Sequence, residues 1–294
     1  MTAADDALQT FRRVAADWHP SAVDTDDVIA AGPARRFSAI LDVDSPVTGA
    51  GDVLPPLWHR FFFLPVHPHA SLGPDGHPRT TPLTPPIGAH RRLFGGCRIS
   101  FQRPLRCDDH VHRRSEVIGV RAPTGRGGPL LIVTIRHTCS IDDEPYISEE
   151  HDILYRAPLA AKAPPELVSA SSDRPMVEDR WTLSWLPDPV LLFRYSALSQ
   201  NAHRIHYDEP YSREVEGHPG LVVQGLLLAL LMLELPRRFA PDRRIDSLTW
   251  RADSSLYAGQ RLYAYGRPAA AGAELSIGNG ATPEAITGTV TFAS

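Results

Sequence analysis

Residues 221–235 constrain the fold more than any other part of this chain. They are apolar except for Gln224, Gly225 and Glu234. A helix that is apolar on every side has to be buried on every side. The run is too short to span a bilayer as a helix. We therefore expect a helix at the centre of a core, with the rest of the chain folded around it.

A polar segment leads directly into this helix. His203, His206 and Asp208 fall within six residues of one another. Because buried surroundings shift the pKa values of ionisable groups, the segment is a candidate reaction site. His203 precedes His206 by three residues, so both side chains lie on the same side if this turn is helical.

Composition narrows the class of protein. The 294 residues suffice for one large domain or two ordinary ones. Hydrophobic residues make up 43% and charged residues 22%, both typical of a soluble globular protein. The net charge of -4 argues against an electrostatic nucleic-acid binder. Three cysteines without a C-x-x-C spacing, and an acidic start without an apolar stretch, predict a cytoplasmic protein with no membrane partner.

The start of the chain reads as helical. Apolar residues at helical spacing predict a helix over residues 1 to about 20. Thr25 is a candidate cap for a short second helix at 28–30. A loose alternation at 37–43 predicts a first strand, and the aromatic residues 61–63 predict a short buried helix.

The middle of the chain changes to a strand pattern. A turn or exposed loop is expected at 73–78, where Gly and Pro gather. The clearest strand is 130–139, which alternates apolar and polar residues after a glycine-rich hairpin turn. Other strands are expected at 98–101, 116–120, 146–156, 181–185, 247–251, 261–267, 274–278 and 286–292.

The chain has the pattern of a duplicated unit. Residues 157–175 are rich in Pro, Ala and Ser and read as a linker. A strand, a break at a leucine and a turn into a longer strand occur on both sides of this linker. We expect an N-terminal domain at 1–160 without a catalytic motif, and a C-terminal domain at 175–294 that carries the site.

The polar segment also resembles a known family. The residues that carry the resemblance are N-A-H-R-I-H-Y-D at 201–208, then Tyr211 and residues 220–225. They resemble the MaoC-like hotdog-fold acyl-thioester hydratases and dehydratases, in the branch that holds mesaconyl-C4-CoA hydratases and mitochondrial-type 3-hydroxyacyl-thioester dehydratases. The resemblance implies an α+β double hotdog, in which antiparallel sheets each wrap around a central apolar helix.

The match to the family pattern is incomplete. The wider group has S-G-D-x-N-P-x-H and then H-G at the start of the central helix. Ser199 and His206 match, whereas Asn201 stands in place of the catalytic Asp. Gln224 and Gly225 stand in place of His-Gly. An amide does not exchange protons usefully, so Asn201 can only position water or substrate.

The resemblance implies a division of roles for hydration or dehydration of an enoyl or 3-hydroxyacyl thioester. His206 is the expected acid and base, with Asp208 and His203 as its partners. Gly225, at the helix start, is expected to help polarise the thioester carbonyl. Gln224 and Tyr211 are candidates for contact with the substrate, although Tyr211 also suits a packing role.

Several alternatives stay open. The substrate is a CoA ester or a carrier-protein ester, and a thioesterase or a non-catalytic thioester binder remains an alternative. The spacing H-x-x-H-x-D at 203–208 also suits metal ligands, but no further ligand cluster accompanies it. No dinucleotide or phosphate-loop motif is present, so we expect no metal or other cofactor. A homodimer is possible.

Overall fold

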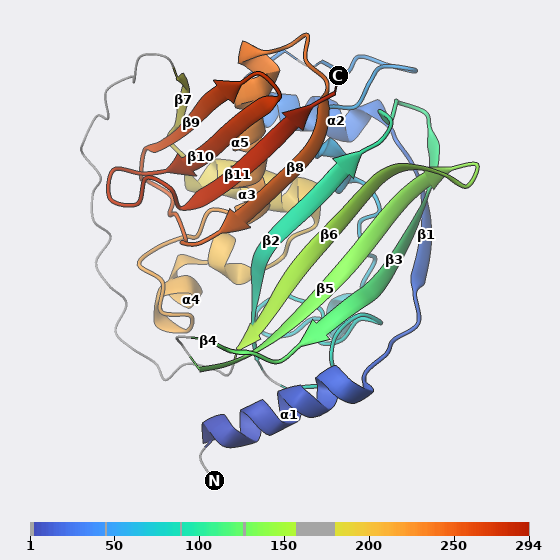
Figure 1. Ribbon diagram of the computed structural model, residues 1–294. Helices are drawn as coiled ribbons and strands as arrows, with labels where there is room; N and C mark the ends of the chain where they lie inside the picture. Colours follow the sequence, from blue (N-terminus) through green and yellow to red (C-terminus); the bar gives the residue numbers. More distant parts are fainter. Residues whose placement is uncertain (1–2, 45, 89, 126–127, 157–179, 294) are drawn as a thin grey trace.

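A computed structural model describes residues 3–44, 46–88, 90–125, 128–156 and 180–293. Figure 1 shows strands that arch over helices on one side of the molecule. The expected linker at 157–175 and the domain boundaries at 160 and 175 lie outside the described residues, so the division into two domains stays a prediction.

All strand pairs in the described chain are antiparallel and belong to one sheet system, in the order β1-β3-β5-β6-β2-β8-β11-β10-β9-β7, with β4 paired to β5. The first-half strands are β1 (Val23–Val28), β2 (Arg91–Phe101), β3 (His110–Arg121), β4 (Thr124–Gly125), β5 (Gly128–Ile141) and β6 (Glu144–Arg156). The second-half strands are β7 (Trp181–Trp185), β8 (Ile245–Ala252), β9 (Leu262–Ala269), β10 (Gly272–Gly278) and β11 (Ile286–Phe292). The expected α+β class is confirmed.

The two halves meet where β2 pairs with β8. Gly96 lies opposite Arg251 and Ser100 lies opposite Ser247, so the hydrogen-bonded ladder continues from one half to the other. Figure 1 shows this junction at the middle of the sheet.

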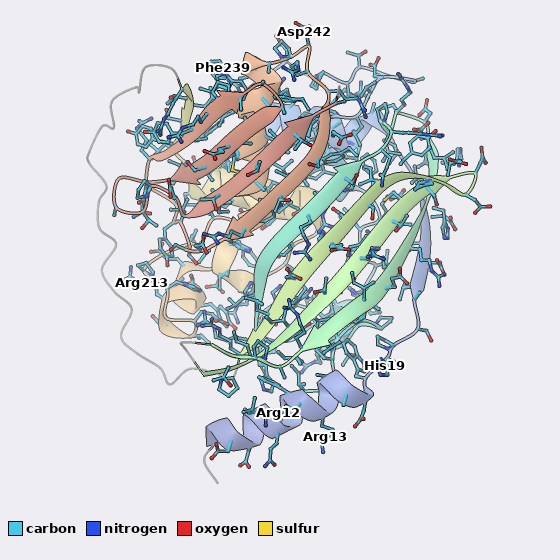
Figure 2. The ribbon with its side chains drawn as sticks, in the orientation of Figure 1. Arg12, Arg13, His19, Arg213, Phe239 and Asp242 are labelled. Atoms are coloured by element: carbon cyan, nitrogen blue, oxygen red, sulfur yellow. The ribbon has the colours of Figure 1, made fainter. Side chains whose placement is uncertain are left out.

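Alternating burial explains the strands of the first half. Leu131, Val133 and Ile135 on β5 are buried on one face, as their spacing predicts. Helix α1 (Ala3–Asp17) covers this face with Phe11 and Val14. Its Arg12 and Arg13 lie on the outward side of the helix, as Figure 2 shows.

Two local predictions for the first half are wrong. The predicted cap and short helix at 25–30 overlap β1, which pairs with β3 and places Asp24 opposite Arg114. The predicted strand at 37–43 is largely helix α2 (Ala31–Ile40). Ala34, Phe37 and Ser38 are buried on one side of α2, which is a helical spacing. The short helix predicted at 61–63 overlaps the 3-10 turn η1 (Trp58–Phe61) only at Phe61, because Phe62 is already extended. A second such turn is η2 (His69–Ser71).

The first half also buries a charged cluster. Glu149 is 1% exposed and accepts hydrogen bonds from Arg60, at 2.9 Å, and His59, at 3.2 Å. His151 lies 3.3 Å from the same carboxylate, and its ring is 4.7 Å from that of His137. We call these five residues the Glu149 cluster.

The second half is built on the predicted apolar helix. It forms α5 (Gly225–Phe239) and is buried from Leu227 to Pro236. It packs against β7, β9 and β10. Glu234, the charged residue in the run, is paired with Arg237 and Arg238. The remaining helical elements lead into α5: α3 (Pro189–Ser199), η3 (Arg204–His206) and α4 (Glu209–Glu214). None of the described helices is long and apolar enough to cross a membrane.

Candidate active site

The candidate site forms where the polar segment meets the start of α5. Helix α3 ends at Ser199 and is followed by Gln200, whose backbone is left-handed; the chain then turns through η3. Val222 donates its N–H to the carbonyl of Ile205 at 2.9 Å. This bond fixes the histidine segment against the residues that open α5.

His206 is held in one tautomer. Its ring is 6% exposed, and Nδ1 lies 2.7 Å from the carbonyl oxygen of Val222. Because a carbonyl only accepts, Nδ1 carries the proton and Nε2 keeps its lone pair. Burial lowers the pKa of His206 to about 4, although the bond to Val222 favours the protonated form. His206 is therefore a neutral base at neutral pH.

His203 lies beside His206. The two ring centroids are 5.6 Å apart, at nearly right angles. The Asn201 side chain accepts a hydrogen bond from the backbone N–H of His203 at 3.2 Å. The role predicted for Asn201, to position water or substrate, stays a prediction. Burial, with His77 and His206 nearby, lowers the pKa of His203 to about 2. The structure thus brings Asn201, His203 and His206 together.

A loop from the first half completes this cluster. His77 Nδ1 lies 3.0 Å from the Asp75 carboxylate, and its ring centroid is 4.2 Å from that of His203. Burial opposes ionisation of Asp75, but the hydrogen bond and charge of His77 lower its pKa to about 2. The sequence predicts the turn at 73–78 but not that this turn packs against His203. The signal available was a glycine flanked by two ionisable residues.

Asp208 turns away from the histidines. It caps α4 by accepting the N–H of Tyr211 at 3.1 Å, and it pairs with Arg204 at 2.8 Å. Those contacts lower its pKa. The Arg204 guanidinium also lies over the Tyr211 ring, 4.0 Å from its centroid. These are contacts that order the segment, and a chemical role for Asp208 or a substrate contact for Tyr211 stays a prediction.

Gln224 and Gly225 form the start of α5. The Gln224 amide nitrogen donates to the Leu192 carbonyl and to Ser196 Oγ, both at 2.9 Å. Its Oε1 is buried and accepts no bond within the described residues. A Cβ added at Gly225 would meet no atom within 4 Å. Leu228 donates its N–H to the carbonyl of Gln224, so the N–H groups of the preceding residues have no partner within the helix.

Two groups in the described chain bring three ligand-type atoms within 4.8 Å of one another: Asp75 with His77 and His203, and Cys97 with Glu149 and His151. In the second group, Glu149 is already paired with Arg60, and the positive charge of Arg60 repels a metal ion. The absence of a metal stays a prediction.

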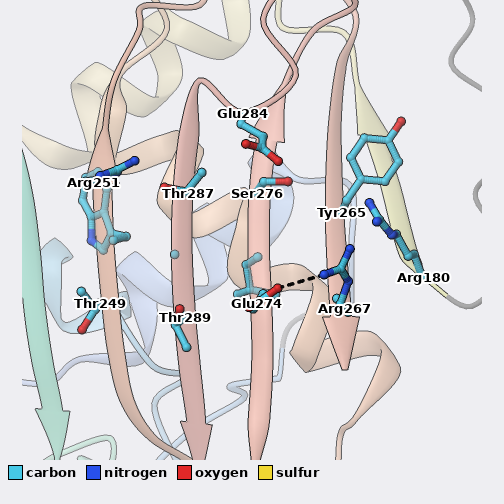
Figure 3. A pocket seen from close by; sticks show the side chains of 13 residues that line it. Arg180, Thr249, Arg251, Tyr265, Arg267, Glu274, Ser276, Glu284, Thr287 and Thr289 are labelled. Carbon is cyan, nitrogen blue, oxygen red and sulfur yellow. Dashed lines mark hydrogen bonds and ion pairs between the residues drawn. The ribbon is translucent and has the colours of Figure 1, made fainter. Parts of the chain in front are cut away.

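A surface depression of about 390 Å³ lies elsewhere. Figure 3 shows Arg251, Thr287, Ser276 and Tyr265 along its floor, on the face of the sheet opposite α5. None of the predicted site residues lines it, so we do not assign the reaction to it.

Comparisons with known proteins agree with this fold. Residues 57–258 match the family model of hydroxyacyl-thioester dehydratase type 2. The chain is 41% identical over 82% of its length, and 84% of the relative, to mesaconyl-C(4)-CoA hydratase from Chloroflexus aurantiacus. A solved MaoC-like dehydratase aligns with 93% of this chain and 97% of its own at a TM-score of 0.67 and 13% identity. A double-hotdog protein from Mycobacterium tuberculosis aligns with 93% of this chain and 96% of its own at a TM-score of 0.59 and 14% identity.

The fold places this chain in the class of double-hotdog proteins. Within that class, the chain belongs to the hydroxyacyl-thioester dehydratase type 2 family. The named relatives are hydratases and dehydratases, which are enzymes of the lyase class.

Proposed function

We propose that this protein adds water to an enoyl thioester, or eliminates it from the 3-hydroxyacyl thioester, with a CoA ester of the mesaconyl-C4-CoA type as substrate. The observation that carries the proposal is the neutral His206, held by Val222 at the open start of α5. The 41% identical hydratase supports the CoA ester and its acyl class.

The site residues can perform the two proton transfers of hydration. His206 Nε2 takes a proton from water as the water oxygen bonds to C3 of the enoyl group. The electron pair of the double bond moves toward the thioester carbonyl, where the free N–H groups and the dipole at the start of α5 stabilise the enolate. The protonated His206 then delivers a proton to C2. Dehydration is the reverse sequence.

The geometry favours a lyase over the alternatives. A hotdog thioesterase would set a carboxylate against the helix start, but Gln224 occupies that position and is bonded to α3. Presentation by a carrier protein remains the second candidate for the same chemistry. The three cysteines are free and buried, which fits the proposed cytoplasmic location. Assembly as a homodimer is part of the proposal.

One assay separates these functions. Mesaconyl-C4-, crotonyl- and itaconyl-CoA are each incubated with the protein while loss of the enoyl absorbance and release of free thiol are followed. We expect enoyl loss without thiol release, fastest for the mesaconyl ester. Thiol release at the same rate would identify a thioesterase. Binding without either signal on every ester would identify a non-catalytic binder.

A further inference from the structure

The loop at 73–78 is attached to the candidate site by its backbone. The carbonyl of Asp75 accepts the N–H of Arg204 at 2.9 Å. The carbonyl of Pro74 accepts from Arg204 Nη1 at 3.0 Å. The loop closes on itself through the Gly73 N–H, which donates to the His77 carbonyl at 2.7 Å. A segment more than a hundred residues earlier in the chain is therefore fixed to the turn between His203 and His206.

Gly76 makes this approach possible. Its φ of +91° lies in the region that side chains disfavour. A Cβ at this position would lie 1.9 Å from the carbonyl oxygen of Ala202, which is an impossible contact. The backbone of the loop thus touches the backbone of the site segment directly, and any side chain at Gly76 would push the two apart.

The loop delivers a carboxylate to the histidines. Single ligand-type atoms of Asp75, His77 and His203 all lie within 4.8 Å of one another. The Asp75 carboxylate holds His77 by a 3.0 Å bond to the ring and a 3.1 Å bond to the backbone N–H. His77 in turn packs on His203, which packs on His206. Asp208, by contrast, forms an ion pair with Arg204.

We propose that Asp75 and His77 are positioning residues for the hydration site, and that Asp75 supplies the carboxylate that the family pattern has at position 201. The proposal rests on the proposed function. Asp75 fixes the His77 ring, and His77 fixes the His203 ring beside His206. A carboxylate this near also stabilises positive charge that develops on the imidazoles during proton transfer. Three further charged or titratable side chains lie around this group: His218, Tyr211 and Arg204.

Substitutions on the loop separate a positioning role from a structural one. Asp75→Asn and His77→Gln keep the approximate shape of each side chain. We expect each to lower kcat by about tenfold to a hundredfold, with KM and the melting temperature nearly unchanged. This is the loss typical of removing the outer hydrogen-bond partner of a metal-bound histidine. Because the two residues act in series, the double variant should be no slower than the worse single variant. The matched control is His69→Gln, an exposed histidine four residues before Gly73 that should match the parent.

Gly76→Ala tests the docking itself. It should lower kcat and raise KM together, because the whole loop is displaced from Ala202. If Asp75→Asn and His77→Gln keep kcat within twofold of the parent, the proposal is overturned. It is equally overturned if they lower only the melting temperature.

Ring resonances of the histidines keep this test independent of the substrate. In 1H–15N spectra of the full chain, Asp75→Asn should shift the His77 and His203 ring signals, whereas His69→Gln should leave them in place. If the parent is inert on every enoyl ester, the proposed function fails. In that case, unshifted ring signals would also overturn the contacts of Asp75 with His77 and of His77 with His203, and shifted signals would support these contacts. Shifted signals with an unchanged rate in an active protein overturn the positioning role.

Discussion

The molecule buries two groups of histidines, and they are built in opposite ways. In the Glu149 cluster, a carboxylate that is 1% exposed is surrounded by Arg60, His59 and His151. Burial would raise the pKa of Glu149, but Arg60 and the two histidines hold it well below its usual value. In the candidate site, His203 and His206 are neutral, and the carboxylate of Asp75 stands at the edge rather than the centre.

The difference separates a group that stabilises the fold from a group that can react. In the Glu149 cluster the charge is satisfied by fixed partners, so moving a proton there would break a buried ion pair. His206 has committed Nδ1 to Val222 and left Nε2 unpaired within the described residues, beside the open start of α5. Histidine content alone does not identify the reactive half of this protein. The unpaired Nε2 of His206 next to the start of α5 is the feature on which the proposed site rests.

The largest expected effect is on the reaction. His206→Ala should lower the single-turnover rate on an enoyl-CoA by about two to four orders of magnitude, the usual value of a proton-transferring group. Asn201→Ala should cost less, because Asn201 holds the backbone of His203 and transfers no proton. Circular dichroism checks that the variants fold. A near-parental rate for His206→Ala would show that the reactive half has been assigned wrongly.

The second effect is on stability. Glu149→Ala leaves Arg60 buried beside apolar residues and should lower the free energy of unfolding by about 3–5 kcal/mol, with the hydration rate per folded molecule unchanged. Urea denaturation gives the free energy, and Glu149→Gln serves as a milder control. Loss of hydration in a fully folded Glu149 variant would erase the distinction between the two groups.

The third effect is the pH dependence of stability. The pKa of His206 is lowered from 6.5 to about 4 in the folded state. Between these values the unfolded chain binds more protons, so the contribution of His206 is fully present above pH 6.5 and is lost as the pH falls toward 4. The slope is at most about 1.4 kcal/mol per pH unit for this one group. Urea denaturation at pH 7.5, 6, 5 and 4.5 should show a shallower decline for His206→Gln than for the parent. Equal slopes would contradict the buried, neutral state of His206.

A smaller effect is expected at Asp208. Asn caps a helix about as well as Asp, so Asp208→Asn removes the ion pair with Arg204 and keeps the cap on α4. We expect the hydration rate within a few-fold of the parent and a stability loss below about 1 kcal/mol, since partly exposed pairs contribute little. A rate as low as that of His206→Ala would instead return Asp208 to the catalytic role that the sequence suggests.

The smallest expected effect is that of metal removal. Dialysis against a chelator should leave the hydration rate unchanged, because the proposed chemistry uses only proton transfers and the N–H groups of α5. Elemental analysis of the protein before and after dialysis is the control. Activity that is lost when a bound metal ion is removed, and that returns when the ion is added back, would identify Asp75, His77 and His203 as metal ligands.

Local patterns predicted the parts of the fold whose burial is regular. Residues alternate along β5 because one face of that strand is more buried than the other. The apolar run of α5 is continuous because the helix is buried on all sides. The pattern failed at 25–30, where β1 pairs with β3, and Asp24 and Asp26 meet His112 and Arg114 across the ladder. Such pairing depends on residues far along the chain, and no short window contains it.

The candidate site likewise combines residues that are close together in the sequence with residues that are far apart in it. His206 and Gly225 could be proposed from the sequence because the motif and the helix start are contiguous in it. The position of Asp75 and His77 beside His203 could not be predicted, because it depends on the approach of Gly76 to Ala202. A backbone-to-backbone approach leaves no sequence pattern except the glycine itself. Asp208 looked suitable by type and distance along the chain, yet its side chain serves the next helix.

The ladder between β2 and β8 bears on how this chain can be divided. Cutting it between the halves would strip the partner from both strands at once and leave two long edges with unsatisfied N–H and C=O groups. Edges of that kind join whatever strand they meet first. The halves expressed as separate polypeptides should therefore aggregate when made alone and reassemble when made together. Each half therefore covers a strand edge of the other, and we expect neither half to fold stably when it is expressed alone.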